Sequence, residues 1–316
     1  MISEPALDRL SAMFAEPDVS GTRYELISVL GRGGMGVVYL ARDTLLDREV
    51  ALKVGDGFEA PHEMAEARIL ARLEHPGIVP IHDVGRLADG RLFYVMKRVQ
   101  GMTLREHLGQ ATDLGERLRI FERICEAVAF AHARRILHRD LKPDNVMIGA
   151  FGEVMVMDWG VAKSLAADEA DTEAGTIIGT HGFMAPEQAR GDTRDLDERT
   201  DVYALGAILL ALLTGRDTGS APLPQPEALE RAPSIPRPLW SVCTRALAAR
   251  PDDRYASASA LREDVARFRA GQAVHAHRET AFERTARLAK MYRTPILLVV
   301  AYMIMRALFA LAVGRR

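Results

Sequence analysis

The stretch HRDLKPDN, residues 138–145, places six polar side chains between two apolar segments. The helix-like run IFERICEAVAFAHARRIL precedes it, and VMI follows it. Because charged side chains are rarely buried unless they are paired, two interpretations fit. The stretch is either a solvated loop or a reaction centre held on a rigid frame, and the rest of the sequence decides between them.

The bulk properties of the chain restrict its class. Its 316 residues exceed what one hydrophobic core usually supports, which predicts two lobes or domains. A formal net charge of −2 without a long basic run argues against nucleic-acid binding. Cys125 and Cys243 are far apart and lack metal-binding spacing, which fits a reducing compartment. The N-terminus has no basic start followed by an apolar core, so we expect no signal peptide.

The pattern of apolar residues changes along the chain. Residues 24–54 read as strands around a glycine-rich turn, and further β-runs follow a helix over 63–74. After Gly101 the long apolar-periodic runs are helical, so the fold class is α+β with a boundary near residue 100. The predicted organisation is an N-terminal extension (1–23), a β-rich lobe (24–100), a helical lobe (101–272), a basic linker or helix (273–294), an apolar helix (295–313) and a short tail (314–316).

Gly31, Gly33 and Gly36 form a G-x-G-x-x-G pattern, which lets backbone N–H groups approach phosphate oxygens. Alone the pattern is weak and also fits a plain glycine-rich hairpin. Here it lies between two strands, whereas a dinucleotide-binding fold needs it between a strand and a helix. The context therefore excludes a dehydrogenase and predicts a flexible β-flap.

Lys53 ends the short β-run VALK that follows this flap. An ammonium group there could hold phosphates, but a buried one would need a carboxylate partner. The helix over 63–74 offers two candidates, Glu63 and Glu66. A solvated lysine is the alternative.

Taken in order, the motifs GRGGMGVVYLA, VALK, EARILARLEHPGIV, HRDLKPDN, MDWG, GTHGFMAPEQ, DVYALG and RPDDR resemble the eukaryotic-type (Hanks-type) serine/threonine protein kinase family. The resemblance covers residues 24–268, and GGMGVVY and YALGAILLALLTGR resemble bacterial members. It implies a bilobal protein kinase fold with a β-rich N-lobe and a helical C-lobe. The implied cofactors are ATP and Mg²⁺, or Mn²⁺ in its place.

The resemblance assigns ATP binding mainly to the first lobe. Lys53 is implied to hold the α- and β-phosphates and to pair with Glu66, because EARIL matches the family's helix motif. The residues implied to bind ATP are Leu30, Gly31, Arg32, Gly33, Gly34, Met35, Gly36, Val38, Ala51, Lys53, Met96 and Val99.

The resemblance assigns the chemistry to the opening stretch. Asp140 is implied to orient the substrate hydroxyl and accept its proton, and Lys142 to lie beside the transferring phosphate. Asn145 and Asp158 are implied to bind the metal, since hard Mg²⁺ prefers oxygen ligands. A carboxylate with a pKa of about 3.9 is a poor base at neutral pH, but it can collect a proton late in the reaction. The fixed order of these residues favours the reaction centre over the solvated loop.

The sequence departs from the family once in these motifs. Trp159 stands where the family usually has Phe, which mainly changes packing volume and is compatible with activity. It could also shift the balance between active and inactive loop positions. Three further residues are implied to be structural, with Glu187 and Arg254 as a buried pair and Asp201 tying the catalytic loop to its helix.

Substrate class and regulation also follow from the resemblance. Lys142 and Thr180 match the serine/threonine branch, and Thr180 is implied to shape the acceptor site. Arg139 implies a basic pocket for a phosphate on the activation segment, 158–187. Of its hydroxyl residues, which include Ser164, we favour Thr172 and Thr176 as autophosphorylation sites, with unmodified threonines as the alternative.

Residues 295–313 are apolar except for Arg306, and this segment is long enough to cross a bilayer core of ~30 Å as a helix. The cationic stretch before them predicts a single-pass span in the cytoplasmic membrane with the kinase in the cytoplasm. A central arginine costs about 2.5–3.5 kcal/mol, so a helix packed on the kinase or in the interface plane stays open, with a cytoplasmic location. The basic residues of the cationic stretch that precedes the apolar segment are Arg278, Arg284, Arg287, Lys290 and Arg293.

Together these patterns predict an ATP- and magnesium-dependent kinase that phosphorylates protein serine and threonine residues and its own activation segment. A homodimer is a possible partner arrangement, and nucleic acid is not expected. A pseudokinase scaffold is the main alternative, but Lys53, Glu66, Asp140, Asn145 and Asp158 are all present. A small-molecule kinase of similar fold is less consistent with GTHGFMAPEQ, which resembles a peptide-acceptor platform.

Overall fold

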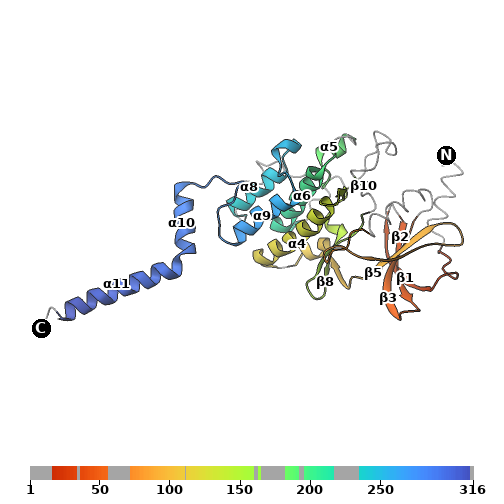
Figure 1. The fold of residues 1–316 in the computed structure, drawn as a ribbon, viewed down its shortest axis with the longest axis horizontal. Coiled ribbons are helices and arrows are strands. Elements are labelled where there is room, and N and C mark those ends of the chain that lie inside the picture. The colour runs from red at the N-terminus through yellow and green to blue at the C-terminus, as the bar shows by residue number, and fades with distance from the viewer. Residues whose placement is uncertain are drawn as a thin grey trace.

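The computed structural model describes residues 16–33, 36–55, 72–110, 112–159, 163–164, 182–191, 196–216 and 235–313. Within these ranges the chain forms a β-sheet lobe followed by a helical lobe, at the right and the centre of Figure 1. The predicted bilobal α+β arrangement is confirmed. Glu66, Gly34, Met35, Thr172, Thr176 and Thr180 lie outside the described residues.

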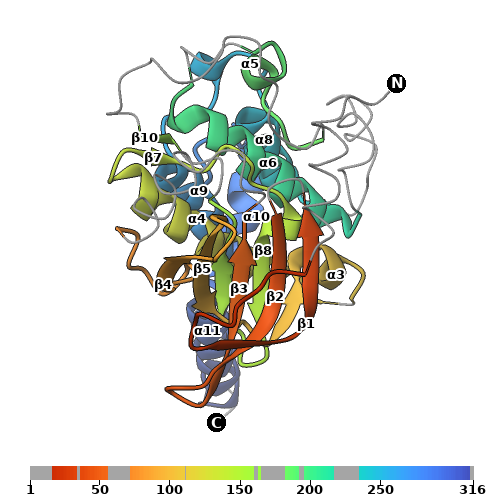
Figure 2. The same cartoon turned by 90° about the vertical axis from the view of Figure 1, so that its right-hand side faces the viewer.

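The first lobe is one antiparallel sheet with strand order β1-β2-β3-β5-β4. Figure 2 shows the first three strands side by side. β1 and β2 form the predicted hairpin around the glycine-rich turn, with Gly33 opposite Gly36. The strands are β1 (Tyr24–Gly33), β2 (Gly36–Asp43), β3 (Arg48–Val54), β4 (Ile81–Arg86) and β5 (Leu92–Lys97).

The two faces of this sheet have different roles, because successive side chains on a strand point to opposite faces. One face packs into a core that includes Val37, Tyr39, Leu52, Phe93 and Val95. The other face carries two cross-strand rows given by the register. These rows are Val38–Lys53–Tyr94 and Leu40–Ala51–Met96.

The second lobe is built around helices α4 and α6, which pack against each other and against α8 and α9. The side chain of Asp113 caps the N-terminus of α4 by accepting from the Glu116 N–H, which satisfies a backbone donor that the helix leaves free. The elements are β6 (Gly101–Thr103), α3 (Leu104–Leu108), α4 (Leu114–His132), β7 (Ile136–Leu137), the 3₁₀ turn η1 (Pro143–Asn145), β8 (Val146–Gly149), β9 (Val154–Val156), β10 (Lys163–Ser164), α5 (Pro186–Ala189), α6 (Glu198–Thr214), α8 (Arg237–Ala246), the 3₁₀ turn η4 (Pro251–Asp253) and α9 (Ala258–Arg269).

Helix α6 is apolar on nearly all sides and lies inside the lobe, as an all-round hydrophobic helix must. It ends at Gly215, whose φ of 66° is the left-handed conformation that glycine adopts without strain. Its first turn carries Asp201, which is buried. The helix therefore places a carboxylate inside the lobe, next to the catalytic loop.

The chain stays packed on the helical lobe beyond α9. The buried carboxylate of Asp264 accepts hydrogen bonds from the Tyr255 hydroxyl at 2.8 Å, the His275 N–H at 2.7 Å and the Ala276 N–H at 3.0 Å. Val274 is part of the core of this lobe. Core packing thus extends past residue 272, where we placed the end of the lobe.

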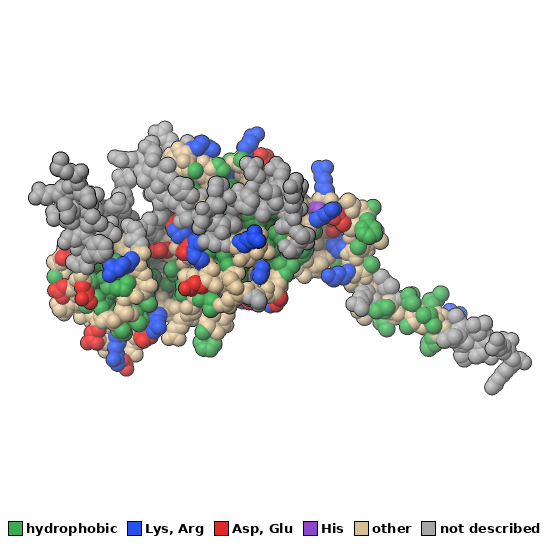
Figure 3. Space-filling view, turned by 180° about the vertical axis from the view of Figure 1, so that it is seen from behind, with side chains coloured by type: hydrophobic (Ala, Val, Ile, Leu, Met, Phe, Trp, Pro, Cys, Tyr) green, Lys and Arg blue, Asp and Glu red, His purple; other side chains and the backbone are tan. Residues whose placement is uncertain are grey.

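Two further helices, α10 (Ala281–Met291) and α11 (Arg293–Val313), extend away from the lobes in Figure 1. Figure 3 shows apolar side chains on the surface of the described part of α11. Among the described residues, however, no helix is both long and apolar enough to cross a membrane.

The membrane span predicted over 295–313, and the membrane localisation that depends on it, are therefore not supported.

Candidate catalytic centre

The catalytic loop, residues 138–145, runs from β7 to η1 and is fixed to α6 by Asp201. One Asp201 carboxylate oxygen accepts from the His138 N–H at 2.8 Å, and the other accepts from the Arg139 N–H at 2.9 Å. His132 on α4 places its Nε2 2.8 Å from the same carboxylate. Burial raises the pKa of Asp201, but the hydrogen bond and charge of His132 and the contacts with His138 outweigh it, so the pKa is below its usual range.

These bonds hold an unusual backbone conformation. Arg139 has φ of 67°, in the left-handed region that non-glycine residues rarely adopt. Its carbonyl accepts from Gln188 Nε2 at 2.8 Å, so α5 also supports the loop. Neither His132 nor Gln188 is among the residues predicted to act at the site. The only sequence signal for Gln188 is its place in the GTHGFMAPEQ motif.

Asp140 lies at the centre of the loop with two polar neighbours. Lys142 Nζ donates to Asp140 Oδ2 at 2.6 Å. Asn145 Nδ2 donates to the Asp140 carbonyl at 2.8 Å and to its Oδ2 at 3.2 Å. With its NH₂ group committed to Asp140, Asn145 keeps its amide oxygen for another partner.

Lys53 and Asp158 connect the two lobes. Lys53 Nζ lies 2.8 Å from Asp158 Oδ1, and the lysine side chain is 5% exposed. Asp158 has φ of 61°, and the Met157 N–H beside it donates to the Asn145 carbonyl at 2.9 Å. Burial raises the pKa of the Asp158 carboxyl, but the charge and hydrogen bond of Lys53 outweigh it, so the pKa is below its usual value.

Trp159 fills the space beneath the loop. It is 1% exposed, and its ring centroid lies 4.5 Å from that of His138. His138 Nε2 is 3.1 Å from the Met157 carbonyl, and burial lowers the pKa of the imidazole. The indole Nε1 has no hydrogen-bond partner in the described part of the chain. A buried neutral imidazole therefore packs on a buried indole below the polar loop.

Of the residues predicted to contact the nucleotide, Val38, Ala51, Lys53 and Met96 lie on the face of the sheet opposite its core. Val38 lies in the same cross-strand row as Lys53, Ala51 and Met96 lie in the neighbouring row, and Val99 follows β5. Leu30, Gly31, Arg32 and Gly33 are on β1, beside the turn to Gly36. A Cβ on Gly36 would lie 2.1 Å from the Val54 carbonyl oxygen, and its φ is 118°. Only glycine fits this end of the flap.

Glu187 and Arg254 form a buried, doubly hydrogen-bonded pair between α5 and η4, with N···O distances of 2.7 and 2.8 Å. Arg254 also donates to the carbonyls of Arg199, Ala248 and Ala249. The pair therefore fixes α5 to the segment that follows η4.

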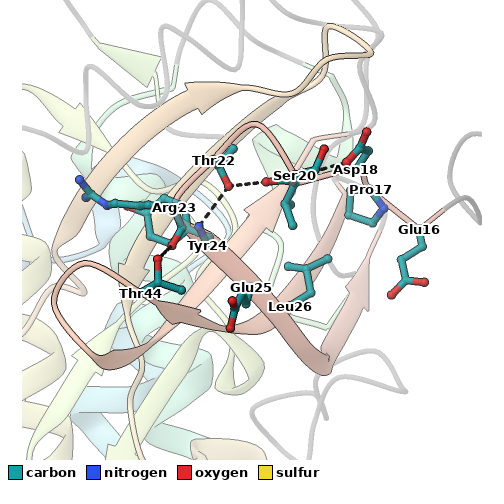
Figure 4. A pocket seen from close by; sticks show the side chains of 11 residues that line it. Glu16, Pro17, Asp18, Ser20, Thr22, Arg23, Tyr24, Glu25, Leu26 and Thr44 are labelled. Atoms are coloured by element: carbon teal, nitrogen blue, oxygen red, sulfur yellow. Dashed lines mark hydrogen bonds between the residues drawn. The ribbon is translucent and has the colours of Figure 1, made fainter.

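The pocket in Figure 4 lies elsewhere, at the start of β1. Thr22 Oγ1 donates to the Val19 carbonyl at 2.8 Å and accepts from the Tyr24 N–H at 3.1 Å, so local turns shape its wall. None of the described residues that are predicted to bind ATP lines it. We therefore regard it as a hollow at the edge of the sheet, lined by Glu16, Pro17, Asp18, Val19, Ser20, Thr22, Arg23, Tyr24, Glu25, Leu26 and Thr44.

Comparison with known proteins places this arrangement in a family. The model of the protein kinase domain matches residues 24–264. The chain belongs to the protein kinase family. Within it, the chain is similar to bacterial serine/threonine protein kinases of the Hanks type.

Three relatives illustrate this similarity. Serine/threonine-protein kinase PknB of Mycolicibacterium smegmatis is 39% identical over 298 residues, covering 86% of this chain and 47% of the relative. PknD of Chlamydia caviae is 37% identical over 288 residues, covering 77% and 31%. PknB of Mycobacterium leprae is 39% identical over 272 residues, covering 79% and 43%. The chain thus spans less than half the length of these curated relatives.

Proposed function

We propose that this kinase transfers the γ-phosphate of ATP to serine and threonine hydroxyls of proteins, with Mg²⁺ as cofactor. The main support is that Asp140, Lys142, Asn145, Lys53 and Asp158, from both lobes, form one connected polar centre. Phosphoryl transfer needs little covalent chemistry from a protein, and it depends on positioning and on cations near the phosphate oxygens.

The residues at this centre suit a magnesium ion shared with a nucleotide. Among the described residues, no group of three or more His, Cys, Asp and Glu could hold a metal alone. One carboxylate and one amide oxygen, from Asp158 and Asn145, match the way Mg²⁺ is bound when phosphates supply the other ligands. A bound ion would neutralise charge on the β- and γ-phosphates.

Each remaining residue has a role in this proposal. The substrate hydroxyl oxygen attacks the γ-phosphorus, the bond to the ADP oxygen breaks, and Asp140 takes the hydroxyl proton as the bond forms. Lys142, which contacts Asp140, offsets negative charge on the transferring group. Lys53 holds the α- and β-phosphates above Asp158. Glu66 as its second partner and Thr180 at the acceptor site remain predictions outside the described residues.

We also propose that phosphorylation of Thr172 or Thr176 orders the activation segment through Arg139. A phosphate with a charge of about −2 pairs well with a guanidinium group. If one copy phosphorylates another in a homodimer, the rate per molecule rises with protein concentration. A rate that does not depend on concentration argues for reaction within one chain.

The full chain with ATP, Mg²⁺ and a generic Ser/Thr substrate tests the function, with mass spectrometry of residues 158–187. We expect phosphate on substrate and segment in the wild type and none in Asp140→Asn. Nucleotide binding without any transfer would instead support the pseudokinase alternative, which the complete set of described polar residues disfavours.

A further inference from the structure

The proposed reaction uses Asp140 and Lys142, and the proposed activation uses Arg139. Of the charged residues of HRDLKPDN, this leaves Asp144 without a role. Its two carboxylate oxygens accept from Nε and an NH₂ group of Arg105, at 2.6 and 2.5 Å. This is the two-pronged geometry in which a guanidinium group binds a carboxylate most firmly. Arg105 lies 39 residues earlier, on α3.

Both partners are attached to backbone that is already fixed. Thr103 caps α3 in a capping box with Glu106, so the helix that carries Arg105 begins at a defined point. The preceding strand β6 pairs with β8, with Thr103 opposite Met147. The segment β6–α3 is therefore joined to the segment η1–β8 at two points, by the β6–β8 pairing and by the Arg105–Asp144 pair. Together the two segments form a closed ring.

This ring includes Asn145. Residues 144 and 145 are neighbours in a 3₁₀ turn, where successive side chains are about 120° apart. Asn145 points into the protein, where it is 3% exposed and bonded to Asp140, while Asp144 leaves the turn towards α3. Rotating η1 to move the Asn145 amide would require both hydrogen bonds from Arg105 to break.

We propose that Arg105 is a positioning residue for the metal site, acting through Asp144 to hold Asn145 in its binding orientation. This inference depends on the function proposed above. Arg105→Met then weakens metal binding and lowers kcat without changing the KM for the protein substrate. Because a residue behind a metal ligand typically contributes 10- to 100-fold, we expect a loss of about tenfold.

The test measures the metal directly and does not require activity. Mn²⁺ binding is titrated by electron paramagnetic resonance on the full chain with a non-hydrolysable ATP analogue. Arg105→Met and Asp144→Asn should each raise the Mn²⁺ dissociation constant about tenfold. The double variant should raise it no further, because both changes break one interaction. Arg105→Lys keeps the charge but loses the fork, so its value should fall between those of wild type and Arg105→Met.

Arg262→Met is the matched control. It breaks the Arg262–Glu126 pair, which also joins two elements at similar exposure but lies away from the loop. We expect its Mn²⁺ binding to equal that of the wild type. If Arg105→Met lowers the melting temperature more than Arg262→Met does, the Mn²⁺ dissociation constants of Asp144→Asn and Arg105→Lys are compared instead. A larger constant for Asp144→Asn supports the inference, and equal constants oppose it.

Two outcomes overturn the inference. Mn²⁺ affinity in Arg105→Met equal to that of Arg262→Met means that the pair does not position Asn145. Additive losses in the double variant mean that Asp144 acts on the metal through its own charge. Failure of the proposed function is distinguishable, because wild-type protein would then transfer no phosphate whatever the binding titration shows.

Discussion

Lys53 on β3 and Asp158 before Trp159 are 105 residues apart in the chain and form a 2.8 Å ion pair between the two lobes. The φ of 61° at Asp158 directs its carboxylate to this lysine. The geometry brings the proposed phosphate ligand and the proposed metal ligand to one point. The position of one residue therefore depends on the position of the other.

Asp158→Asn should abolish phosphate transfer, lowering kcat/KM at least about a hundredfold, because an amide is a weak ligand for a hard cation. Steady-state assays of the purified full chain give this value. Asp89→Asn is the control, since Asp89 pairs with its sequence neighbour Arg91 and is not assigned to the catalytic centre. Activity of Asp158→Asn within a few-fold of the control would contradict the assigned role.

Gly36→Ala and Gly31→Ala should differ, although both glycines belong to the same motif. A Cβ at Gly36 would overlap the Val54 carbonyl at φ of 118°, whereas a Cβ at Gly31 meets nothing within 4 Å. An alanine at position 36 would introduce strain of about 1–3 kcal/mol. Since 1.4 kcal/mol corresponds to a tenfold change in an equilibrium constant, we expect the KM for ATP to rise about tenfold. Gly31→Ala should raise the KM for ATP less than Gly36→Ala does, because it adds no clash with the protein itself. Equal KM values for the two variants would refute this reading of the flap.

Trp159→Phe should retain activity and change the free energy of unfolding by less than about 1.5 kcal/mol. The smaller ring leaves some space next to His138, but it also removes the buried indole N–H, which has no partner among the residues that the structure describes. Trp159→Ala should cost about 3–5 kcal/mol. Urea denaturation of both variants measures these changes, and a Phe variant as unstable as the Ala variant would show that the indole fits its site specifically.

Arg254→Met should lower the free energy of unfolding by about 3–5 kcal/mol, because it leaves the buried Glu187 carboxylate without its charge partner. Arg269→Met, which breaks a partly exposed pair with Glu122, should cost less, about 1 kcal/mol. A loss in Arg254→Met no larger than in Arg269→Met would mean that the buried pair contributes little.

The same pair predicts a pH dependence. Burial raises the pKa of Glu187, but the hydrogen bonds and charge of Arg254 outweigh it, so the folded pKa lies below the unfolded value of about 4.3. The stabilisation is therefore complete above about pH 5 and is lost as the pH falls through the folded pKa. The difference in the free energy of unfolding between wild type and Glu187→Gln should become smaller as the pH falls from about 5 through the folded pKa of Glu187. Denaturant unfolding at pH 7 and at pH 4 checks it, and a difference that grows in acid would reverse the assignment.

The sheet and the catalytic loop were predictable because their signals are local. Clusters of β-forming residues around a glycine-rich turn predicted the strands of residues 24–54, whereas the assignment of Val38 and Lys53 to the face opposite the core comes from the folded sheet. The order of polar residues in 138–145 likewise identified Asp140, Lys142 and Asn145, which the structure brings together.

Long-range partners were not predictable from these patterns. Nothing local to Arg105 or Asp144 indicates that they meet, because the ring that joins them depends on β6 pairing with β8. The difference between Gly31 and Gly36 was equally hidden, since backbone φ and the nearness of Val54 come from the folded hairpin. The predicted membrane span had a strong local signal and was still not supported.

The three hydrogen bonds to Asp264 bear on where this kinase can be cut. The family match ends at residue 264, yet Asp264 holds the backbone of His275 and Ala276, and Val274 completes the core. A fragment ending at 264 would expose apolar surface and leave a buried carboxylate without two of its three donors. A protease should therefore spare the segment between 264 and 276 and cleave first near Arg278 or Arg284, so the smallest fragment that folds independently ends close to residue 280.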